Sequence, residues 1–267
     1  MRLHFPQAIW KHRELIWRLS QREIQGRYRG SILGMGWSFL QPLAMLAVYT
    51  FVFSQVFQTR WGGIEQAGPL AFAVNLFAGL IVFNLFAECA SRGPGLITAN
   101  PNYVKKVVFP LETLAPVSLA TATFHALSSL GVLLIFELTS FGRIPITVLW
   151  LPIVWLPVLL GSLAILWVLS AIGVFLRDID QVIGVGVNML MFLSPIFFPL
   201  SALPPRWIPL LRVNPLAQAV EQTRAVLVLG HKPGSSYLII GIGLGIAACE
   251  LAYLGFQRAK PAFADVI

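Results

Sequence analysis

The chain has 267 residues, of which 57% are apolar and only 11% carry a charge, and its 19 Lys and Arg exceed its 11 Asp and Glu. Because an average soluble domain has about 25% charged residues, this deficit excludes a water-soluble enzyme of ordinary design. Much of the exterior has to face hydrocarbon instead of water, so the composition predicts an all-α integral membrane protein.

Residues 1–29 form a basic, amphipathic segment. From Phe5 to Gln25, residues such as Lys11 and Arg22 fall on one side of a helical wheel, and Trp10 and Trp17 fall on the other. This pattern predicts a helix that lies in the cytoplasmic interface of the membrane, with its tryptophans at headgroup depth. Two interpretations stay open, namely a collar that a partner protein contacts and a generic basic anchor before the first span.

Six stretches without Asp, Glu, Lys or Arg set the number of predicted spans. They cover residues 30–59, 66–87, 113–136, 144–176, 181–205 and 233–249. A spanning helix needs about 20 apolar residues, and the last stretch reaches this length by continuing past Glu250. We therefore predict six transmembrane helices within residues 30–259, followed by a cytoplasmic tail over residues 260–267. In the last helix, the spacing of Gly241 and Gly245 allows close contact with another helix.

The basic residues predict how this domain is oriented. If both termini are cytoplasmic, 13 of the 19 Lys and Arg lie on the cytoplasmic side, in agreement with the positive-inside rule. The net charge of +8 then reflects topology and attraction to anionic lipid headgroups. Nucleic-acid binding is the weaker interpretation of this charge, and we expect no nucleic-acid partner.

Two connections between the spans have predicted structure. Residues 92–110 form a cytoplasmic loop whose prolines allow only short helical pieces, and a loop of this size can be gripped by another protein. Residues 201–230 are too polar to cross the membrane and too apolar for a free loop. Asn214 and Gly230 mark the start and the stop of a helix there. We therefore predict two short helices that dip into the outer leaflet.

The motifs that the sequence lacks restrict its chemistry. No Gly-Lys dipeptide occurs, so a Walker A loop is absent and any ATPase that drives transport is another chain. The four histidines and two cysteines show no metal-ligand spacing, and we expect neither a metal, a cofactor nor a catalytic residue in this chain. His125 is the one titratable group well inside a predicted span, and a hydrogen-bonded interhelical histidine is its simplest interpretation.

Aromatic side chains gather in the first and fifth predicted spans. The two groups are Trp37, Tyr49 and Phe51, and Phe192, Phe197 and Phe198. Aromatic faces stack against sugar rings and also seal a pore against water. Aromatic residues in membrane helices often face lipid or fill the packing between helices instead, so both a channel and a packing role stay open.

Four motifs stand in chain order along most of the sequence. Residues 27–34 read RYRGSILG, residues 100–112 read NPNYVKKVVFPLE, residues 177–181 read RDIDQ before FLSPIFFP at 192–199, and NPL at 214–216 precedes Glu221 and Arg224. Together they resemble the permease subunits of ATP-binding-cassette exporters for cell-surface polysaccharides, which include the O-antigen, capsule and teichoic acid exporters.

This resemblance implies a homodimer of six-span subunits in the bacterial inner membrane. The dimer would pair with two copies of a separate nucleotide-binding protein that binds ATP and Mg, and it would export a lipid-linked polysaccharide. Two sets of residues would then contact the ATPase. They are Asn100, Pro101, Lys105 and Lys106 in the loop after the second span, and Arg177, Asp178 and Gln181 in the turn after the fourth.

The resemblance also assigns roles along the substrate's path. Arg27 and Arg29 would contact the pyrophosphate of the lipid, whose oxygens a guanidinium fork can bind bidentately, and anchoring of the topology by positive charge is the alternative. The aromatic groups would line a channel between the subunits. Two other functions stay open. One is a permease for a drug or a simple lipid, and the other is a membrane enzyme acting on a polyprenyl lipid, which the scarcity of acidic residues disfavours.

Overall fold

The computed structural model describes residues 4–53, 68–105, 109–199 and 204–266, and in these ranges every regular element is a helix. The α-helices are α1 (Phe5–Lys11), α2 (Arg13–Tyr28), α3 (Trp37–Phe51), α4 (Gly68–Arg92), α5 (Pro101–Val104), α6 (Leu114–Phe141), α7 (Leu151–Phe175), α8 (Ile179–Phe192), α9 (Ile208–Val213), α10 (Pro215–Leu227), α11 (Ser235–Ala259) and α12 (Phe263–Val266). Short 3-10 helices are η1 (Gly34–Gly36), η3 (Leu111–Thr113), η4 (Ile146–Trp150), η6 (Pro205–Trp207) and η7 (Lys260–Ala262). The all-α prediction is confirmed for these ranges.

Four helical segments are long and apolar enough to cross a bilayer. They are Leu70–Arg92, Leu111–Phe141, Ile146–Phe175 and Ser235–Val266, and each overlaps one predicted span. The other two predicted spans correspond to shorter helices. Helix α3 has 15 residues and lies before residues 54–67, which are outside the described ranges, and α8 has 14 residues. The total of six spans therefore stays a prediction.

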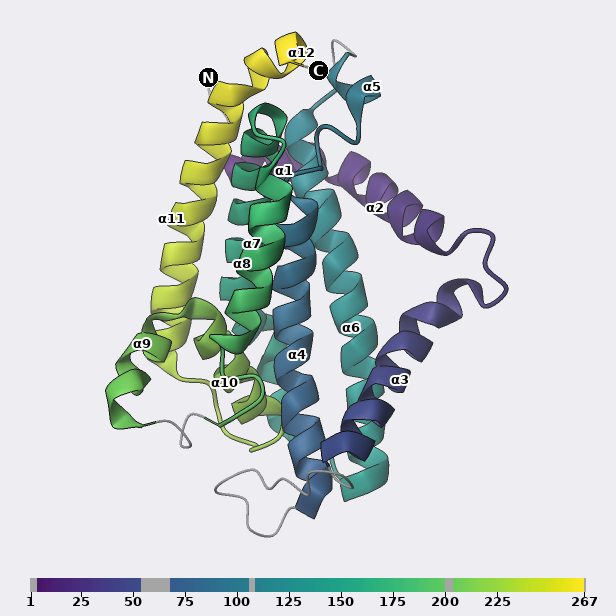
Figure 1. Cartoon of the computed structure of the whole chain (residues 1–267), viewed down its shortest axis with the longest axis vertical. Coiled ribbons are helices and arrows are strands. Elements are labelled where there is room, and N and C mark those ends of the chain that lie inside the picture. Colours follow the sequence, from purple (N-terminus) through teal and green to yellow (C-terminus); the bar gives the residue numbers. More distant parts are fainter. Residues whose placement is uncertain (1–3, 54–67, 106–108, 200–203, 267) are drawn as a thin grey trace.

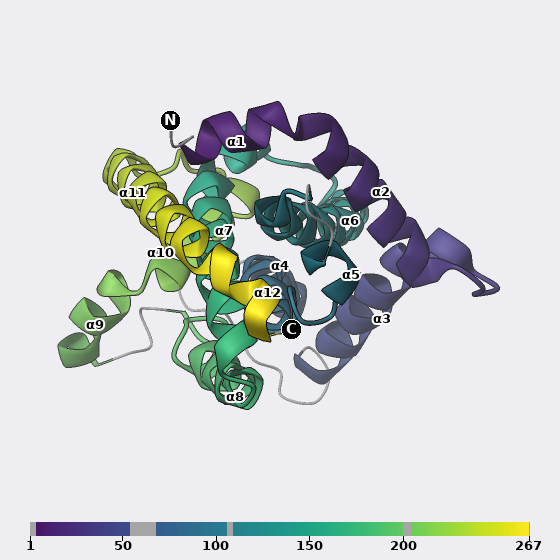
Figure 2. The same cartoon turned by 90° about the horizontal axis from the view of Figure 1, so that it is seen from above.

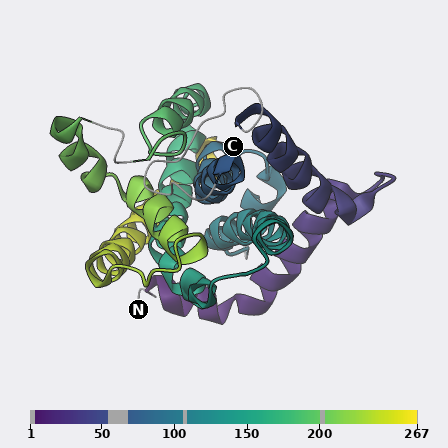
Figure 3. The same cartoon turned by 90° about the horizontal axis from the view of Figure 1, so that it is seen from below.

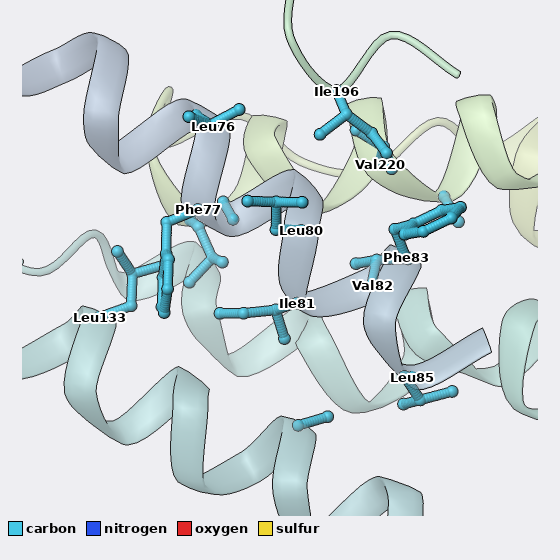
Figure 4. Close-up of a cluster of buried hydrophobic side chains, with 14 of the residues drawn as sticks. Leu76, Phe77, Leu80, Ile81, Val82, Phe83, Leu85, Leu133, Ile196 and Val220 are labelled. Atoms are coloured by element: carbon cyan, nitrogen blue, oxygen red, sulfur yellow. The ribbon is translucent and has the colours of Figure 1, made fainter. Parts of the chain in front are cut away.

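Helix α4 occupies the centre of the bundle (Figure 2). It packs against α3, α6, α7, α8 and α10. Its apolar residues, among them Leu76, Phe77 and Ile81, meet Leu133 of α6 and Val220 of α10 in one buried cluster (Figure 4). Since α4 is apolar on most of its surface, with 78% of its most apolar window buried, it can be enclosed by neighbours on most sides. It serves as the common support for the other helices.

The ends of the bundle are distinct (Figure 1). Helices α1, α5 and α12 lie at one end, and α9 and α10 lie toward the other. The predicted N-terminal helix is present as two helices, α1 and α2, which are separated at His12. They wrap around the outside of the bundle (Figure 2), where α1 contacts α11 and α2 contacts α6. One end of the bundle therefore contains α1, the loop that includes α5, and the C-terminal tail.

Helix α10 begins and ends where the sequence predicts. The Asn214 side-chain oxygen accepts hydrogen bonds from the backbone N–H groups of Leu216 at 2.9 Å and Ala217 at 3.4 Å. This is the N-cap arrangement that supplies acceptors to the first turn of a helix. Gly230 has a φ of 67°, a left-handed conformation that glycine adopts at low cost. Local chemistry therefore sets both limits of this segment.

The Gly241 and Gly245 pair forms a close helix contact within the chain. An ideal Cβ on Gly241 would lie 3.0 Å from Pro157 Cβ, and one on Gly245 would lie 2.8 Å from Leu160 Cβ. Because neither glycine has a side chain, α11 approaches α7 closely along its length (Figure 1). The glycine spacing therefore serves the contact between α7 and α11.

We expect Gly245→Ala to lower the thermal stability of the purified protein in detergent. Its new methyl group would overlap Leu160, and overpacking of this kind costs about 1–3 kcal/mol. Gly243→Ala on the same helix is the matched control, because a Cβ there meets nothing within 4 Å. Melting followed by tryptophan fluorescence should show a lower midpoint for Gly245→Ala alone. Equal midpoints for the two variants would contradict the close packing.

Candidate functional site

The two segments predicted to contact an ATPase meet at one end of the bundle. A cavity of about 750 Å³ is lined by Asn100 from the loop after α4 and by Arg177 and Asp180 from the junction of α7 and α8. Val266 near the end of the chain lines the same cavity. The cavity therefore brings Asn100, at the start of the first motif, together with the turn at 177–181, and the C-terminal tail adds a third segment to its lining.

Glycines bring the loop and the turn together. An ideal Cβ on Gly173 of α7 would lie 2.1 Å from the Pro94 carbonyl oxygen, and one on Gly93 would lie 2.7 Å from Leu169 Cβ. No larger side chain fits at either position unless the backbone shifts. The loop backbone thus packs directly on α7, which fixes the position of the loop relative to the turn at the end of that helix.

The predicted coupling residues present charges of both signs at this end. The exposed ones are Lys105, Arg177, Asp178 and Gln181. Asn100 and Pro101 are partly buried and begin α5, and the Asn100 side-chain amide donates to the Leu96 carbonyl at 3.0 Å. Lys106 lies outside the described residues. The short helix α5 is therefore held by its own loop, with Lys105 exposed immediately after it.

Residues that the sequence analysis did not single out connect this surface to the rest of the protein. Arg22 of α2 donates a hydrogen bond to the Tyr103 hydroxyl, and the Tyr103 ring stacks on Phe109 with the ring centroids 4.2 Å apart. In the tail, Lys260 Nζ lies 2.7 Å from Glu112 Oε2. The Arg22–Tyr103 and Lys260–Glu112 pairs join segments far apart in the sequence, so no local periodicity or spacing could have indicated them.

A cluster of charged groups joins α2 to α4 and α6 near the same end. Arg27 Nη1 lies 2.8 Å from Glu88 Oε1, and His125 Nδ1 lies 2.9 Å from Glu88 Oε2. Arg92 pairs with Glu23 and approaches Glu88 Oε1 at 3.6 Å. Each carboxylate thus has a cation beside it, which offsets the cost of removing charge from water. His125 is a hydrogen-bonded interhelical histidine, as its place in the sequence indicates.

The two arginines predicted to bind pyrophosphate lie at the end of α2. Arg27 is held by Glu88, yet 52% of its side chain is exposed, so part of its donor fork stays accessible to an anion. Arg29 follows the last residue of α2 and has an exposed side chain. The carboxylate beside Arg27 is not evident from the sequence, because Glu88 stands at the end of a different predicted span.

Arg224 of α10 is a buried cation in the part of the bundle away from the cavity that Asn100 and Arg177 line. Its side chain is 3% exposed and donates to the carbonyl oxygens of Asn75, Pro195 and Ile196. Glu221 Oε1 accepts a further hydrogen bond at 2.9 Å. Burial lowers the pKa of Arg224 to about 10, and Glu221 opposes that shift, so the guanidinium is charged at neutral pH. It ties α10 to α4 and to the turn after α8.

The predicted channel aromatics divide into exposed and partly buried groups. The exposed ones are Trp37 and Phe51 on α3 and Phe192 on α8, and the partly buried ones are Tyr49, Phe197 and Phe198. Phe192 stacks on Phe197 with the ring centroids 5.7 Å apart. Helices α3 and α8 lie on different sides of α4 (Figure 3). The structure therefore places the two aromatic groups apart within one chain.

These features define a class of protein. A bundle of apolar helices has exposed residues of both charges beside a cavity at one end, and in its other half a buried arginine holds a short helix that does not reach span length. The four long apolar helices are those expected of a membrane protein. The chain belongs to the ABC-2 type transporter family, whose model matches residues 14–228.

The names of individual relatives indicate what proteins similar to this chain transport. The chain is 26% identical to the O-antigen export system permease protein RfbA of Myxococcus xanthus, over 99% of this chain and 100% of that protein. It is 23% identical to the protein of the same name from Klebsiella pneumoniae over 93% of each chain. It is 29% identical to the polysialic acid transport protein KpsM of Escherichia coli, over 79% of this chain and 80% of that protein. The resemblance found in the four motifs is confirmed.

We expect Arg224→Lys to destabilise the protein in detergent. A lysine ammonium cannot reach all of the acceptors that the guanidinium fork serves, and each buried acceptor left without a donor costs about 1–3 kcal/mol. Arg206→Lys is the matched control, because Arg206 is exposed in η6. Resistance to limited proteolysis during heating measures the difference. Identical resistance in the two variants would show that Arg224 does not hold α10 in place.

Proposed function

We propose that the chain is the transmembrane subunit of an ATP-driven exporter that moves a lipid-linked polysaccharide, of the O-antigen type, across a bacterial inner membrane. One observation supports this most strongly, which is that the similarity to O-antigen export permeases extends over the whole chain. The proposal includes six spans, with both termini in the cytoplasm. The clustering of α1, α5 and α12 at one end of the bundle supports this topology.

The region around the cavity that Asn100 and Arg177 line, called the coupling surface from here on, is the proposed contact with the ATPase. Its cavity brings together Asn100 and Arg177, and the surrounding charges of both signs suit a protein partner. Arg22 and Tyr103 link α2 to α5, so a movement of the docked ATPase would move both elements together. Two copies of the partner bind ATP and Mg, and closure of one copy on the other would pull these elements as rigid levers.

The proposed channel needs a second copy of this chain. The exposed aromatic and apolar residues of α3 and α8 lie on different sides of α4, so neither helix closes a pore by itself. In a homodimer, α3 of one subunit and α8 of the other would face the same space. Flexible sugar chains would slide past their aromatic rings by stacking. Residues 201–230, with α9 and α10, would form the gate in the outer leaflet, and residues 201–203 of this segment lie outside the described ranges.

Arg27 and Arg29 are proposed to receive the pyrophosphate of the lipid-linked glycan. Both stand at the end of α2, and the connection through η1 leads from them to α3. The exposed part of Arg27 and the exposed Arg29 could bind phosphate oxygens while Glu88 holds Arg27 in position. The anionic group would then begin its path beside the helix that carries the first group of aromatic residues.

Co-expression with a nucleotide-binding protein encoded beside this chain tests the coupling. We expect the wild-type chain to co-purify with the partner and to hydrolyse ATP in lipid only as that complex. Arg177→Glu should reduce co-purification and ATP turnover by about tenfold, since a hydrogen bond to a charged group contributes about 1.5–3 kcal/mol. The control is Arg143→Glu, which changes another exposed arginine, between α6 and η4, outside both the coupling surface and the proposed gate. Loss of activity in both variants, or in neither, would reject the assigned surface.

The aromatic channel has its own test in cells. We expect Phe197→Ala combined with Phe198→Ala to lower the amount of surface polysaccharide while ATP hydrolysis by the purified complex continues. The reason is that these rings contact the moving sugar and not the nucleotide. The same double substitution at the exposed Ile239 and Ile240 of α11 is the control. Normal export by the phenylalanine variant would remove these residues from the channel.

A further inference from the structure

A cavity of about 560 Å³ lies where α1 ends and α2 begins. Its lining comes entirely from this junction and consists of Lys11, His12, Arg13, Glu14, Leu15 and Arg18. The two helices are separated at His12, so the change of direction there leaves a hollow on the surface. Neither the proposed contact with the ATPase nor the proposed export path includes any residue of this lining.

The cations of the N-terminal helices fall into two groups. Arg22 and Arg27, in the second half of α2, are bonded to side chains of the bundle. Lys11, Arg13 and Arg18 are exposed, and none of them forms an ion pair with another residue of the described ranges. The cations at the junction of α1 and α2 are therefore available to a ligand from outside the chain.

The balance of charge in this cavity indicates the ligand. Three cations and one carboxylate, that of Glu14, line it, which leaves an excess of two positive charges. Arg13 uses Nη1 to donate to the Trp10 carbonyl at 3.2 Å, and most of the five N–H donors of its guanidinium stay free. Guanidinium groups bind phosphate oxygens bidentately, and a lysine ammonium binds them as a point charge. Two phosphates with one negative charge each would match the excess.

Two exposed tryptophans indicate where such phosphates come from. Trp10 of α1 is 70% exposed and Trp17 of α2 is 65% exposed, so each side of the junction carries one. The Arg13 guanidinium lies over the Trp10 ring, 4.9 Å from its centroid. Tryptophan is enriched at the depth of the lipid headgroups, and unpaired cations beside it meet lipid phosphates at that depth. These side chains favour a membrane lipid over a phosphate dissolved in water.

The two sides of the junction are held in place by different parts of the bundle. In α1, Phe5 is buried against the Trp167 ring of α7, and the preceding His4 Nδ1 lies 2.7 Å from Glu250 Oε1 of α11. Helix α2 packs on α6 instead, along the outside of the bundle (Figure 2). The hollow between them is therefore formed before a ligand binds, which lowers the cost of ordering the site.

We propose that the junction of α1 and α2 binds the headgroup of one anionic phospholipid with two phosphates, as in cardiolipin. One phosphate lies between Lys11 and Arg13 and the other beside Arg18, and the acyl chains extend past Trp10 and Trp17 into the membrane. Basic pockets on the cytoplasmic side of membrane proteins recognise this class of lipid. The site is independent of the exported molecule, and binding there fixes the depth of both N-terminal helices in the membrane interface.

Native mass spectrometry of the full-length protein in detergent tests the choice of lipid. The protein is titrated separately with cardiolipin, phosphatidylglycerol and phosphatidylcholine that carry the same acyl chain. We expect the first equivalent of cardiolipin to bind about tenfold more tightly than phosphatidylglycerol, a ratio that corresponds to about 1.4 kcal/mol, and phosphatidylcholine to bind more weakly than both. Equal binding of cardiolipin and phosphatidylglycerol, or of all three lipids, overturns the proposal.

A triple variant locates the binding at the junction. Lys11→Gln, Arg13→Gln and Arg18→Gln together should weaken the binding of the first cardiolipin about tenfold, a loss of about 1.4 kcal/mol. The matched control also removes three exposed cations, by Arg143→Gln, Lys232→Gln and Arg258→Gln, and should bind cardiolipin as the wild type does. Gel filtration and circular dichroism establish that both variants are folded. An equal loss in the two variants would show attraction by net charge alone and overturn the site.

The same triple variant distinguishes a lipid from a protein partner. It is co-expressed with the nucleotide-binding protein encoded beside this chain, and we expect it to co-purify with that protein as the wild type does. The Arg177→Glu variant, which tests the coupling surface, should in turn bind cardiolipin normally. A triple variant that keeps its cardiolipin binding and loses the partner would make the junction a protein contact and overturn the proposal.

Discussion

Helix α4 is enclosed by α3, α6, α7, α8 and α10, which shields most of its side chains from both lipid and water. Between membrane helices the hydrophobic effect gives little driving force, so close packing and satisfied polar groups have to hold the bundle together. Helix α4 supplies both. Its apolar residues pack in one cluster with Leu133 and Val220 (Figure 4). Toward its two ends, Asn75 and Glu88 receive hydrogen bonds from other elements.

The polar contacts of α4 lie toward both of its ends. Near one end, Glu88 connects α4 to α2 and α6 through Arg27 and His125. Toward the other, the Asn75 carbonyl accepts from Arg224, which also binds the turn after α8. In the proposed transport cycle, the coupling surface and the outer gate are therefore both attached to the same central helix. Their attachments differ in chemistry, because the first is a partly exposed ion pair and the second is a buried guanidinium on backbone carbonyls.

Local features of the sequence predicted much of the fold. Stretches without charge gave the four long helices, since a helix surrounded by lipid or by other apolar helices cannot place a charge on its surface at low cost. Asn214 and Gly230 gave the limits of α10 because capping and left-handed φ depend on neighbouring residues alone. The break between α1 and α2 was missed, although His12 and Arg13, where it falls, interrupt the apolar side of the predicted helix. The coupling residues came from motifs, and their meeting with Val266 came from the fold.

The sequence by itself determined that this is a helical membrane protein without its own ATPase motif, and it assigned the polysaccharide-exporter family, because composition, charge-free length and short motifs are properties of consecutive residues. Only the tertiary structure decided which charges neutralise one another. Arg27 with Glu88 and Lys260 with Glu112 join distant segments, and packing alone brings them within reach. The same is true of the cavity beside Asn100 and Arg177, whose walls come from segments that follow one another in the sequence but lie side by side only in the fold.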